Sequence, residues 1–314
     1  MTPDATWSIG ELAARAGVTV KTVRFYSDHG LLPEAGRSAG GHRRYGPGAL
    51  ERIGLIRSLR ALGLPVAEVA GVLDAEAARD GLDSAVESAV AGQLREVGSQ
   101  LAALRWREAA LRLVHDCPPG ERAERLRLVG AVTTPPTTAS LVRFWRRWLP
   151  PRLPARVVAA VVEHAVPQPP ADPAPAEVLA FARLHALVSG PCTGGAAHCR
   201  PAAHRGGTGY RPAVLYEGLP EAYALASAEL LARRGPGPGE ALDSFVAVHA
   251  AACGTRDTPA FRRQLGGTLA ADPRIDSYWE QAAVLFGPAA PTPGAAHDWL
   301  CAALAADEEP AAAA

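Results

Sequence analysis

The chain has 314 residues, of which 32 are basic and 32 acidic, and the resulting zero net charge at pH 7 excludes a uniformly basic nucleic-acid-binding coat. A hydrophobic content of 48% excludes wholesale disorder, and the length favours two domains because one core usually serves about 100–200 residues. The charge is uneven, since residues 1–60 carry nine cations and five anions, and this net +4 indicates a polyanionic partner for the segment.

Two short helices joined by a tight turn are predicted at the start of the chain. Ser8 and Glu11 have the spacing of a capping box, which marks the beginning of the first helix. Gly17 is a favourable left-handed terminator for it, and Thr19 then caps the second helix. Two helices joined this closely are the signature of a helix-turn-helix motif.

The second helix and the ribbon after it carry similar side chains. Val20 and Val23 are expected to face the core. The positions expected to point elsewhere are cationic or phenolic: Lys21, Arg24 and Tyr26. Taken alone, they fit a solvated face as well as a binding face. Residues 43–45 (Arg-Arg-Tyr) follow a glycine pair and repeat the chemistry on a predicted basic ribbon, since guanidinium and phenol groups both donate to phosphate oxygens. The layout predicts a winged helix-turn-helix with a small β wing.

A third and a fourth helix are expected next, the third starting at Gly46-Pro47 and the fourth at Pro65. The apolar residues of the third helix recur about once per turn and are predicted to be core: Leu50, Ile53, Ile56 and Leu59.

From about Leu82 to His115 the chain has no proline, which predicts one helix on the order of 45–50 Å long. Its apolar positions step by four and three residues in a heptad seam: Val90, Leu94, Val97, Leu101, Leu104 and Leu111. Such a narrow seam favours a coiled-coil partner, so we expect dimerisation with a second copy of the chain. The alternative is a long helix that lies on the C-terminal domain.

An all-α domain is predicted after residues 117–120, because proline and glycine clusters separate helical segments and no alternating strand pattern appears. The predicted domains are residues 1–75, 76–117 and 118–314. The expected C-terminal helices are Glu121–Ala131, Ser140–Leu149, Ala155–Val166, Ala176–Val188, Pro212–Arg234, Glu240–Cys253, Pro259–Ala271, Pro273–Phe286 and Ala295–Ala305.

With these residues in view, the segment from Ser8 to about Leu73 strongly resembles the DNA-binding domain of the MerR family of bacterial transcription regulators. Five runs, in this order, carry the resemblance: Ser8-Ile9-Gly10-Glu11-Leu12-Ala13, Thr22-Val23-Arg24-Phe25-Tyr26, Gly30-Leu31-Leu32-Pro33, Gly41-His42-Arg43-Arg44-Tyr45 and Leu59-Arg60-Ala61-Leu62-Gly63. The heptad seam sits where that family has its dimerisation helix. Beyond Cys117 the chain is only vaguely similar to helical effector regions of actinobacterial members.

The resemblance implies a homodimer on a pseudo-palindromic promoter, which bends and untwists an over-long spacer so that RNA polymerase can engage both promoter elements. Carried over by position, the groove-reading helix supplies Thr19, Lys21, Arg24 and Tyr26, and the wing supplies His42, Arg43, Arg44 and Tyr45. Phe25 and His42 depart from the tyrosines common in relatives, and Gly46-Pro47 replaces the usual side-chain cap. Arg43→Ala is expected to weaken DNA binding and to flatten its salt dependence.

Three hypotheses remain for the C-terminal domain. The first is an apolar pocket, formed among its helical aromatics, for an unidentified small-molecule effector. The second is a metal sensor that holds zinc, with candidate ligands at Cys117 and in one loop: Cys192, His198, Cys199 and His204. The third is a protein-interaction module that senses nothing.

An enzyme is not expected, because no nucleophile elbow, phosphate-binding glycine loop or HExxH motif is present. No cationic segment followed by an apolar one marks a secretory signal, and no apolar run approaches the ~20 residues of a membrane span. The five scattered cysteines fit reduced thiols, so the sequence predicts a cytoplasmic protein without a membrane partner.

Overall fold

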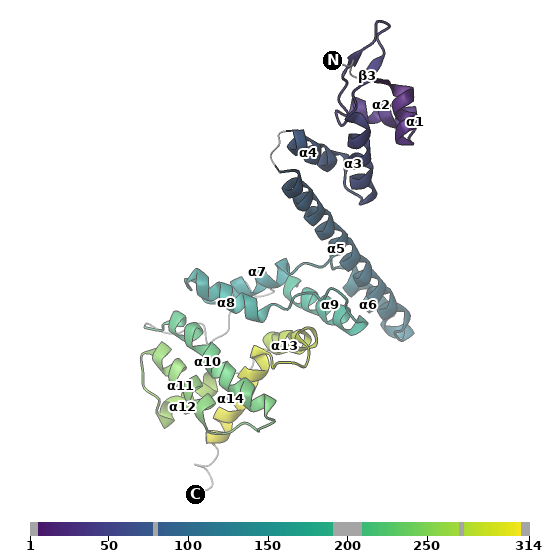
Figure 1. Ribbon diagram of the computed structural model, residues 1–314. Coiled ribbons are helices and arrows are strands. Elements are labelled where there is room, and N and C mark those ends of the chain that lie inside the picture. Colours follow the sequence, from purple (N-terminus) through teal and green to yellow (C-terminus); the bar gives the residue numbers. More distant parts are fainter. Residues whose placement is uncertain (1–5, 78–80, 191–208, 270–272, 309–314) are drawn as a thin grey trace. The chain divides into compact units, whose positions relative to one another are not determined.

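The computed structural model describes residues 6–77, 81–190, 209–269 and 273–308, and the chain divides into two compact units, residues 1–100 and 101–314. The described residues are mainly helical, with one small sheet (Figure 1). Helix α5 (Leu82–His115) begins in the first unit and ends in the second. Side chains of α5 contribute to a core at each end of the helix, and the three-part division at residues 75 and 117 stays a prediction.

The first unit begins with a helix-turn-helix whose caps follow the prediction. The Ser8 backbone N–H donates to Glu11 Oε2 (2.7 Å) and the Glu11 N–H donates to Ser8 Oγ (3.3 Å), which completes the capping box. Gly17 ends the first helix with a left-handed φ of 61°. Thr19 Oγ1 accepts from the Thr22 N–H (3.1 Å) and caps the second helix. The elements are β1 (Trp7–Ser8), α1 (Ile9–Ala16), α2 (Val20–Asp28), β2 (Gly36–Arg37), β3 (Arg43–Tyr45), α3 (Ala49–Ala61) and α4 (Val66–Ala77).

The wing is a three-stranded antiparallel sheet with the order β1-β3-β2. Trp7 pairs with Tyr45 and Arg37 with Arg43, so β1 docks the ribbon onto the start of α1. Gly41, with a φ of 79°, forms the turn between β2 and β3, and its N–H donates to the Ser38 carbonyl (2.8 Å). The sequence predicted the ribbon but not β1, because two residues are too short to show an alternating pattern.

Two small clusters form the core of the first unit. One lies among α1, α2, β3 and the start of α3, and the other among α3, α4 and the first turns of α5. Tyr26 packs against both. Two predicted core residues are instead exposed, Val20 and Leu50, whereas the adjacent Ala49 is buried. Helix α3 begins at Ala49 rather than at Gly46-Pro47, and its start has no side-chain cap.

The second unit contains nine further α-helices within the described residues, and most of their bounds lie within two or three residues of the prediction. They are α6 (Arg122–Gly130), α7 (Ala139–Trp148), α8 (Ala155–Ala165), α9 (Pro175–Ser189), α10 (Pro212–Leu231), α11 (Glu240–Cys253), α12 (Pro259–Thr268), α13 (Pro273–Phe286) and α14 (Pro293–Glu308). A short 3₁₀ turn, Pro119–Glu121, precedes α6.

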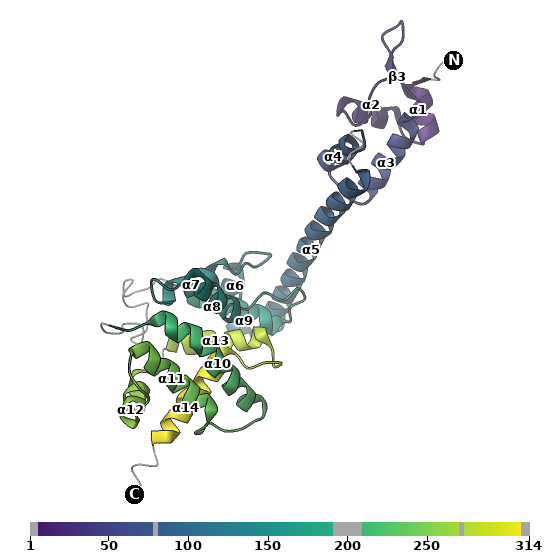
Figure 2. The same ribbon diagram turned by 60° about the vertical axis from the view of Figure 1, so that its left-hand side comes forward.

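The second unit is also built on two clusters. The end of α5 packs with α7, α8, α9 and α13, and Tyr278 of α13 fixes this group by donating to the Ala165 carbonyl (2.7 Å). Helices α10, α11, α12 and α14 form the other cluster, and Figure 2 shows them packed together at the C-terminal end of the chain. Gly294 at the start of α14 lies directly against the Trp279 side chain of α13.

Candidate nucleic-acid interface and effector pocket

The outward face of α2 carries two cations that remain available for binding. Lys21 and Arg24 are exposed, whereas Val23 on the opposite side is fully buried and fixes the rotation of the helix. No ion pair in the described part of the first unit involves either cation. Thr19 is exposed as well, but its hydroxyl is shared with the Thr22 hydroxyl (2.8 Å) and the Thr22 N–H. Lys21 and Arg24 are thus the side chains of this helix best placed to reach phosphate oxygens.

The two tyrosines predicted to contact DNA are less accessible to a ligand than the two cations of α2. Tyr45 has 0% exposure and lies in the core, so its prediction as a DNA contact is corrected. Tyr26 is half-buried between the two clusters. Phe25 is 41% exposed, and its ring lies 4.0 Å from that of His29. The exposed aromatic side chain of α2 is therefore Phe25, which cannot donate a hydrogen bond.

The wing arginines are held by carboxylates. Arg43 lies 2.5 Å from Asp28 and 2.8 Å from Glu34, and the hydrogen bond to Asp28 raises the pKa of its guanidinium. Arg44 lies 3.8 Å from Glu11, and His42 is exposed near the turn. The Arg43 pairs attach the ribbon to the end of α2 and neutralise much of its charge, so its attraction for phosphate is weaker than the sequence implies.

Three further arginines of this basic segment serve the fold. Arg52 Nε donates to the Leu31 carbonyl (2.7 Å), Arg57 to the Ala16 carbonyl (2.9 Å) and Arg60 to the Leu64 carbonyl (2.5 Å). Each of these hydrogen bonds stabilises a helix end or a loop by giving a backbone carbonyl group a donor. The charge excess of residues 1–60 therefore overstates the number of cations available to a polyanion.

The predicted seam is largely exposed along α5. Val90 is half-buried, Leu94 is 68% exposed and Leu104 is 57% exposed. Val97, Leu101 and Leu111 are exposed too. Large apolar side chains rarely remain exposed in a row unless a partner covers them. Their arrangement fits a coiled-coil surface on α5.

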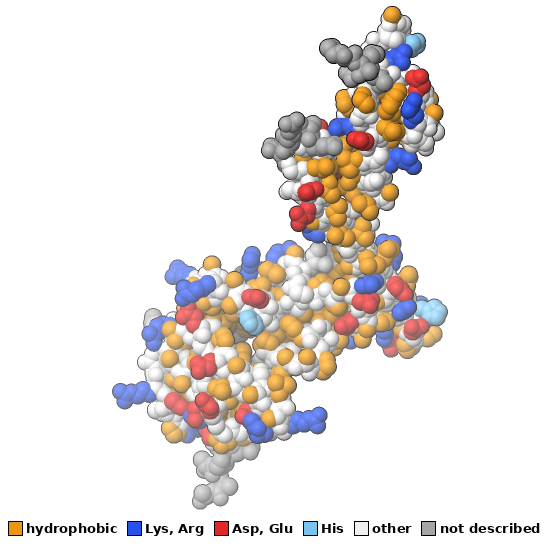
Figure 3. Space-filling view, viewed as in Figure 1, with side chains coloured by type: hydrophobic (Ala, Val, Ile, Leu, Met, Phe, Trp, Pro, Cys, Tyr) orange, Lys and Arg blue, Asp and Glu red, His pale blue; other side chains and the backbone are white. Residues whose placement is uncertain are grey.

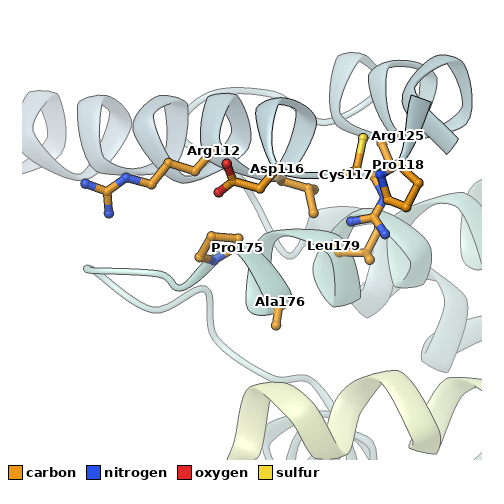
Figure 4. A pocket seen from close by; sticks show the side chains of 9 residues that line it. Arg112, Asp116, Cys117, Pro118, Arg125, Pro175, Ala176 and Leu179 are labelled. Atoms are coloured by element: carbon orange, nitrogen blue, oxygen red, sulfur yellow. The ribbon is translucent and has the colours of Figure 1, made fainter.

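A pocket of about 280 Å³ lies in the second unit, between the end of α5, α6 and the start of α9. Its floor is apolar, formed by Leu113, Pro118, Pro175, Ala176 and Leu179. In Figure 4 the Arg125 guanidinium lies beside Pro118 and Leu179, whereas Arg112 extends along α5 away from them. Arg125 also pairs with Glu121 (2.5 Å), so its remaining N–H groups are available to a ligand.

The residues predicted as metal ligands belong to two separate segments of the chain. Cys117 lines the pocket, but it is buried and its Sγ donates to the Val114 carbonyl (3.2 Å). The neighbouring His115 is paired with Asp116. Across residues 6–77, 81–190, 209–269 and 273–308, no three metal-ligating side chains converge. Cys192, His198, Cys199 and His204 lie outside the described residues.

A cluster of buried polar side chains lies in the core formed by α10, α11 and α14. His297 Nδ1 is 3.2 Å from the Tyr223 hydroxyl and its Nε2 is 3.4 Å from Cys301 Sγ. Burial lowers the pKa of His297 and raises the pKa of Cys301 to about 11, which keeps this thiol protonated and unreactive. His249 packs against Phe245 nearby, and burial, with the adjacent His297, lowers its pKa to about 4.

We expect the second unit to lose stability as the pH falls from about 6.5 to about 4. In this range the unfolded chain protonates His249 whereas the folded chain does not, so the stability present above pH 6.5 declines by ~3 kcal/mol. His249→Leu should flatten the decline, leaving a smaller one from His297. Urea unfolding followed by tryptophan fluorescence at several pH values measures this effect. A His249→Leu variant with the same decline as the parent would contradict the assignment.

Residues 7–76 match the family description "MerR HTH family regulatory protein", and residues 50–114 match "MerR, DNA binding". The mercuric resistance operon regulatory protein of Pseudomonas fluorescens is 37% identical over 105 residues, which cover 33% of this chain and 71% of that protein. The chain belongs to the MerR family of transcription regulators. It is also 48% identical over 73 residues to the transcriptional activator TipA of Streptomyces coelicolor.

The match to TipA covers 23% of this MerR-family chain and 29% of TipA. Among solved structures, the lead(II) complex of PbrR691 from Ralstonia metallidurans is 33% identical and has a TM-score of 0.32, covering 36% of this chain and 89% of that one. Among the described residues, no helix combines the length and apolar character that crossing a membrane requires.

Several features of this MerR-family site were not predicted from the sequence. The carboxylate partners of Arg43, at Asp28 and Glu34, were not identified because they lie in a helix end and a loop without a motif. The pocket was missed because α9, which forms part of its lining, is distant in sequence from the end of α5 and from α6. The prolines at the start of α9, which supplies Pro175 and Ala176 to the pocket lining, predicted the beginning of a helix but not a pocket.

Proposed function

We propose that the protein is a homodimeric promoter-binding regulator that bends and untwists the spacer of its promoter for RNA polymerase. The exposed, unpaired Lys21 and Arg24 on a helix whose other face is anchored by Val23 carry this proposal. Both cations would contact the duplex beside the wing. The exposed seam of α5 supports the dimer, and a two-fold dimer matches a pseudo-palindromic site.

Arg24→Ala is expected to weaken promoter binding and to reduce the slope of log K against log salt by ~0.9 per subunit, because one phosphate contact is lost. Arg43→Ala should reduce the slope less, since Asp28 and Glu34 already balance its charge. Binding isotherms at four salt concentrations measure both slopes. A larger slope change for Arg43→Ala than for Arg24→Ala would place the main phosphate contact on the wing.

The pocket at the end of α5 favours a small-molecule effector for the second unit. Its volume of about 280 Å³ lies near the lower end of ligand sites, and its apolar floor beside Arg125 fits a small, largely apolar molecule with one polar group. Because α5 forms one wall and continues into the first unit, occupancy would act directly on the helix that carries the seam. The alternatives are zinc sensing through Cys117 or the loop ligands, and a ligand-independent interaction module.

Thermal-shift measurements on the full-length chain separate these three hypotheses. A ligand at 100 times its Kd stabilises the folded state by ~2.7 kcal/mol, which a shift in Tm detects. We expect stabilisation by small, largely apolar molecules, and we expect Leu179→Trp, which places a larger side chain beside Arg125 and Pro118, to abolish it. Stabilisation by Zn²⁺ that persists in Leu179→Trp would favour the metal sensor. No stabilisation by either class would favour the interaction module.

A further inference from the structure

A strongly basic segment of the second unit has no role in the function proposed above. Between residues 126 and 162 the chain carries six arginines and neither aspartate nor glutamate, although the whole chain is neutral. Three of them, Arg143, Arg146 and Arg147, lie on α7, and Arg152 follows in the loop before α8. In Figure 3 basic side chains lie along the edge over α7 and α8.

Helix α7 holds its arginines in a fixed arrangement. Leu141, Phe144 and Trp145 are buried on its inner face, and the Phe144 and Trp145 rings lie 5.7 and 5.3 Å from that of Tyr278. The positions of the arginines, three and four residues apart, place their Cβ atoms ~5–6 Å from one another on the outer face. The three arginines therefore project from one face of α7 rather than from all around it.

These arginines also lack the carboxylate partners that several other arginines of the second unit have. Arg105 pairs with Asp172, Arg156 with Glu217, and Arg234 with Glu229. In the part of the chain that the structure describes, no ion pair involves Arg143, Arg146, Arg147 or Arg152. Like charges held together without counter-charges repel one another, and a polyanion relieves that repulsion. The group is therefore placed as a binding surface for negative charge.

The chemistry of this surface favours a phosphate backbone over an acidic protein. Protein interfaces usually have an apolar or aromatic core, yet none of the exposed large apolar side chains among the described residues lies on α7. Guanidinium forks match phosphate oxygens, and duplex DNA presents one phosphate per 3.4 Å on each strand. The protein brings duplex DNA to itself through its first unit, which raises the local concentration of phosphate around the second.

We propose that the outer face of α7 binds duplex DNA through its phosphates, without sequence preference, as a second DNA contact of the chain. The surface consists of Arg143, Arg146 and Arg147, with Arg152 at its edge. The inference rests on the proposed function only in that the first unit supplies the duplex. Its effect is to increase affinity for any DNA that surrounds the operator, in a strongly salt-dependent way.

The test compares full-length variants on a duplex of about 40 base pairs without an operator. Replacing Arg143, Arg146 and Arg147 together with glutamine should reduce the slope of log K against log salt by ~2.7 per subunit and weaken binding about a hundredfold near 0.1 M salt. The matched lysine triple variant should keep the wild-type slope. Glutamine at Arg105, Arg156 and Arg234 removes the same charge from paired sites outside the pocket and should also leave the slope unchanged.

Three outcomes would overturn the proposal: an unchanged slope in the α7 glutamine variant, an equal loss in the lysine variant, or an equal loss in the paired-site variant. Poly-glutamate binding that depends on these arginines, while DNA binding does not, would also overturn it and identify an acidic protein partner. A failure of the proposed promoter function would give a different result, namely equal affinity of the wild-type protein for operator and random duplexes.

Discussion

A chain carrying both Leu94→Glu and Leu101→Glu is expected to be a monomer that binds an operator duplex 10²–10⁴-fold more weakly than the parent, the range that avidity contributes. Leu94 and Leu101 are 68% and 46% exposed on α5, so charge there costs the isolated chain little. In a coiled coil each leucine would contribute ~1.5–3 kcal/mol by burial, and a buried unpaired carboxylate would cost more. Sedimentation velocity and operator titration measure the two effects.

Leu231→Glu supplies the control for this experiment. Leu231 is 61% exposed at the end of α10, far from the seam in sequence, so the same substitution adds a carboxylate without touching α5. This variant should stay dimeric and keep its operator affinity. A dimeric seam variant would show that α5 is not the dimer surface, and the alternative of a helix covered by another part of the chain would then be preferred.

Gly294→Ala is expected to destabilise the second unit by ~1–3 kcal/mol, the usual cost of overpacking a core. A Cβ atom at this position would lie 2.1 Å from Trp279 Cγ and 2.6 Å from its Cβ. These atoms are near the backbone of α13, so no rotation of the indole relieves the overlap and the two helices must separate. Denaturant unfolding followed by tryptophan fluorescence reports on this unit, since five of the six tryptophans lie in it.

The matched substitution is Gly267→Ala in α12. Apart from the adjacent residues and the backbone of α12 itself, no atom lies within 4 Å of a Cβ built there, and alanine favours helix over glycine by ~0.5–1 kcal/mol. This variant should be as stable as the parent or slightly more stable. Equal stability of the two alanine variants would show that the contact between Gly294 and Trp279 is not a constraint on the fold.

The helical elements were largely predictable because their ends carry local signals. Ser8 with Glu11, Thr19 and Gly17 fixed the first two helices by hydrogen bonds that depend on neighbouring residues only. Apolar spacing was less reliable at helix starts. Val20 and Leu50 have the spacing of core residues, yet both side chains are exposed, whereas Val23 and Ala49 in the same first turns are buried. Spacing alone does not show where the buried face of a helix ends.

The site was predictable only where a helix face decided it. Lys21 and Arg24 followed from the rotation of α2, and both are exposed. The wing prediction placed Arg44 and Tyr45 together, although consecutive residues of a strand point to opposite faces. Tyr45 is accordingly buried while Arg44 remains half-exposed. The pocket and the Arg43 pairs depend on tertiary contacts between distant segments, which no local pattern contains.

The position of Tyr26 has a consequence for the cooperativity of the first unit. Its ring touches both clusters, one around the start of α3 and one that includes Leu82 and Ala85 at the start of α5. A shift of the first turns of α5 would be transmitted through this ring to the helix that bears Arg24. The amide hydrogen-exchange rates of the two clusters should consequently change together. Truncation of the Tyr26 side chain would let each cluster open independently of the other.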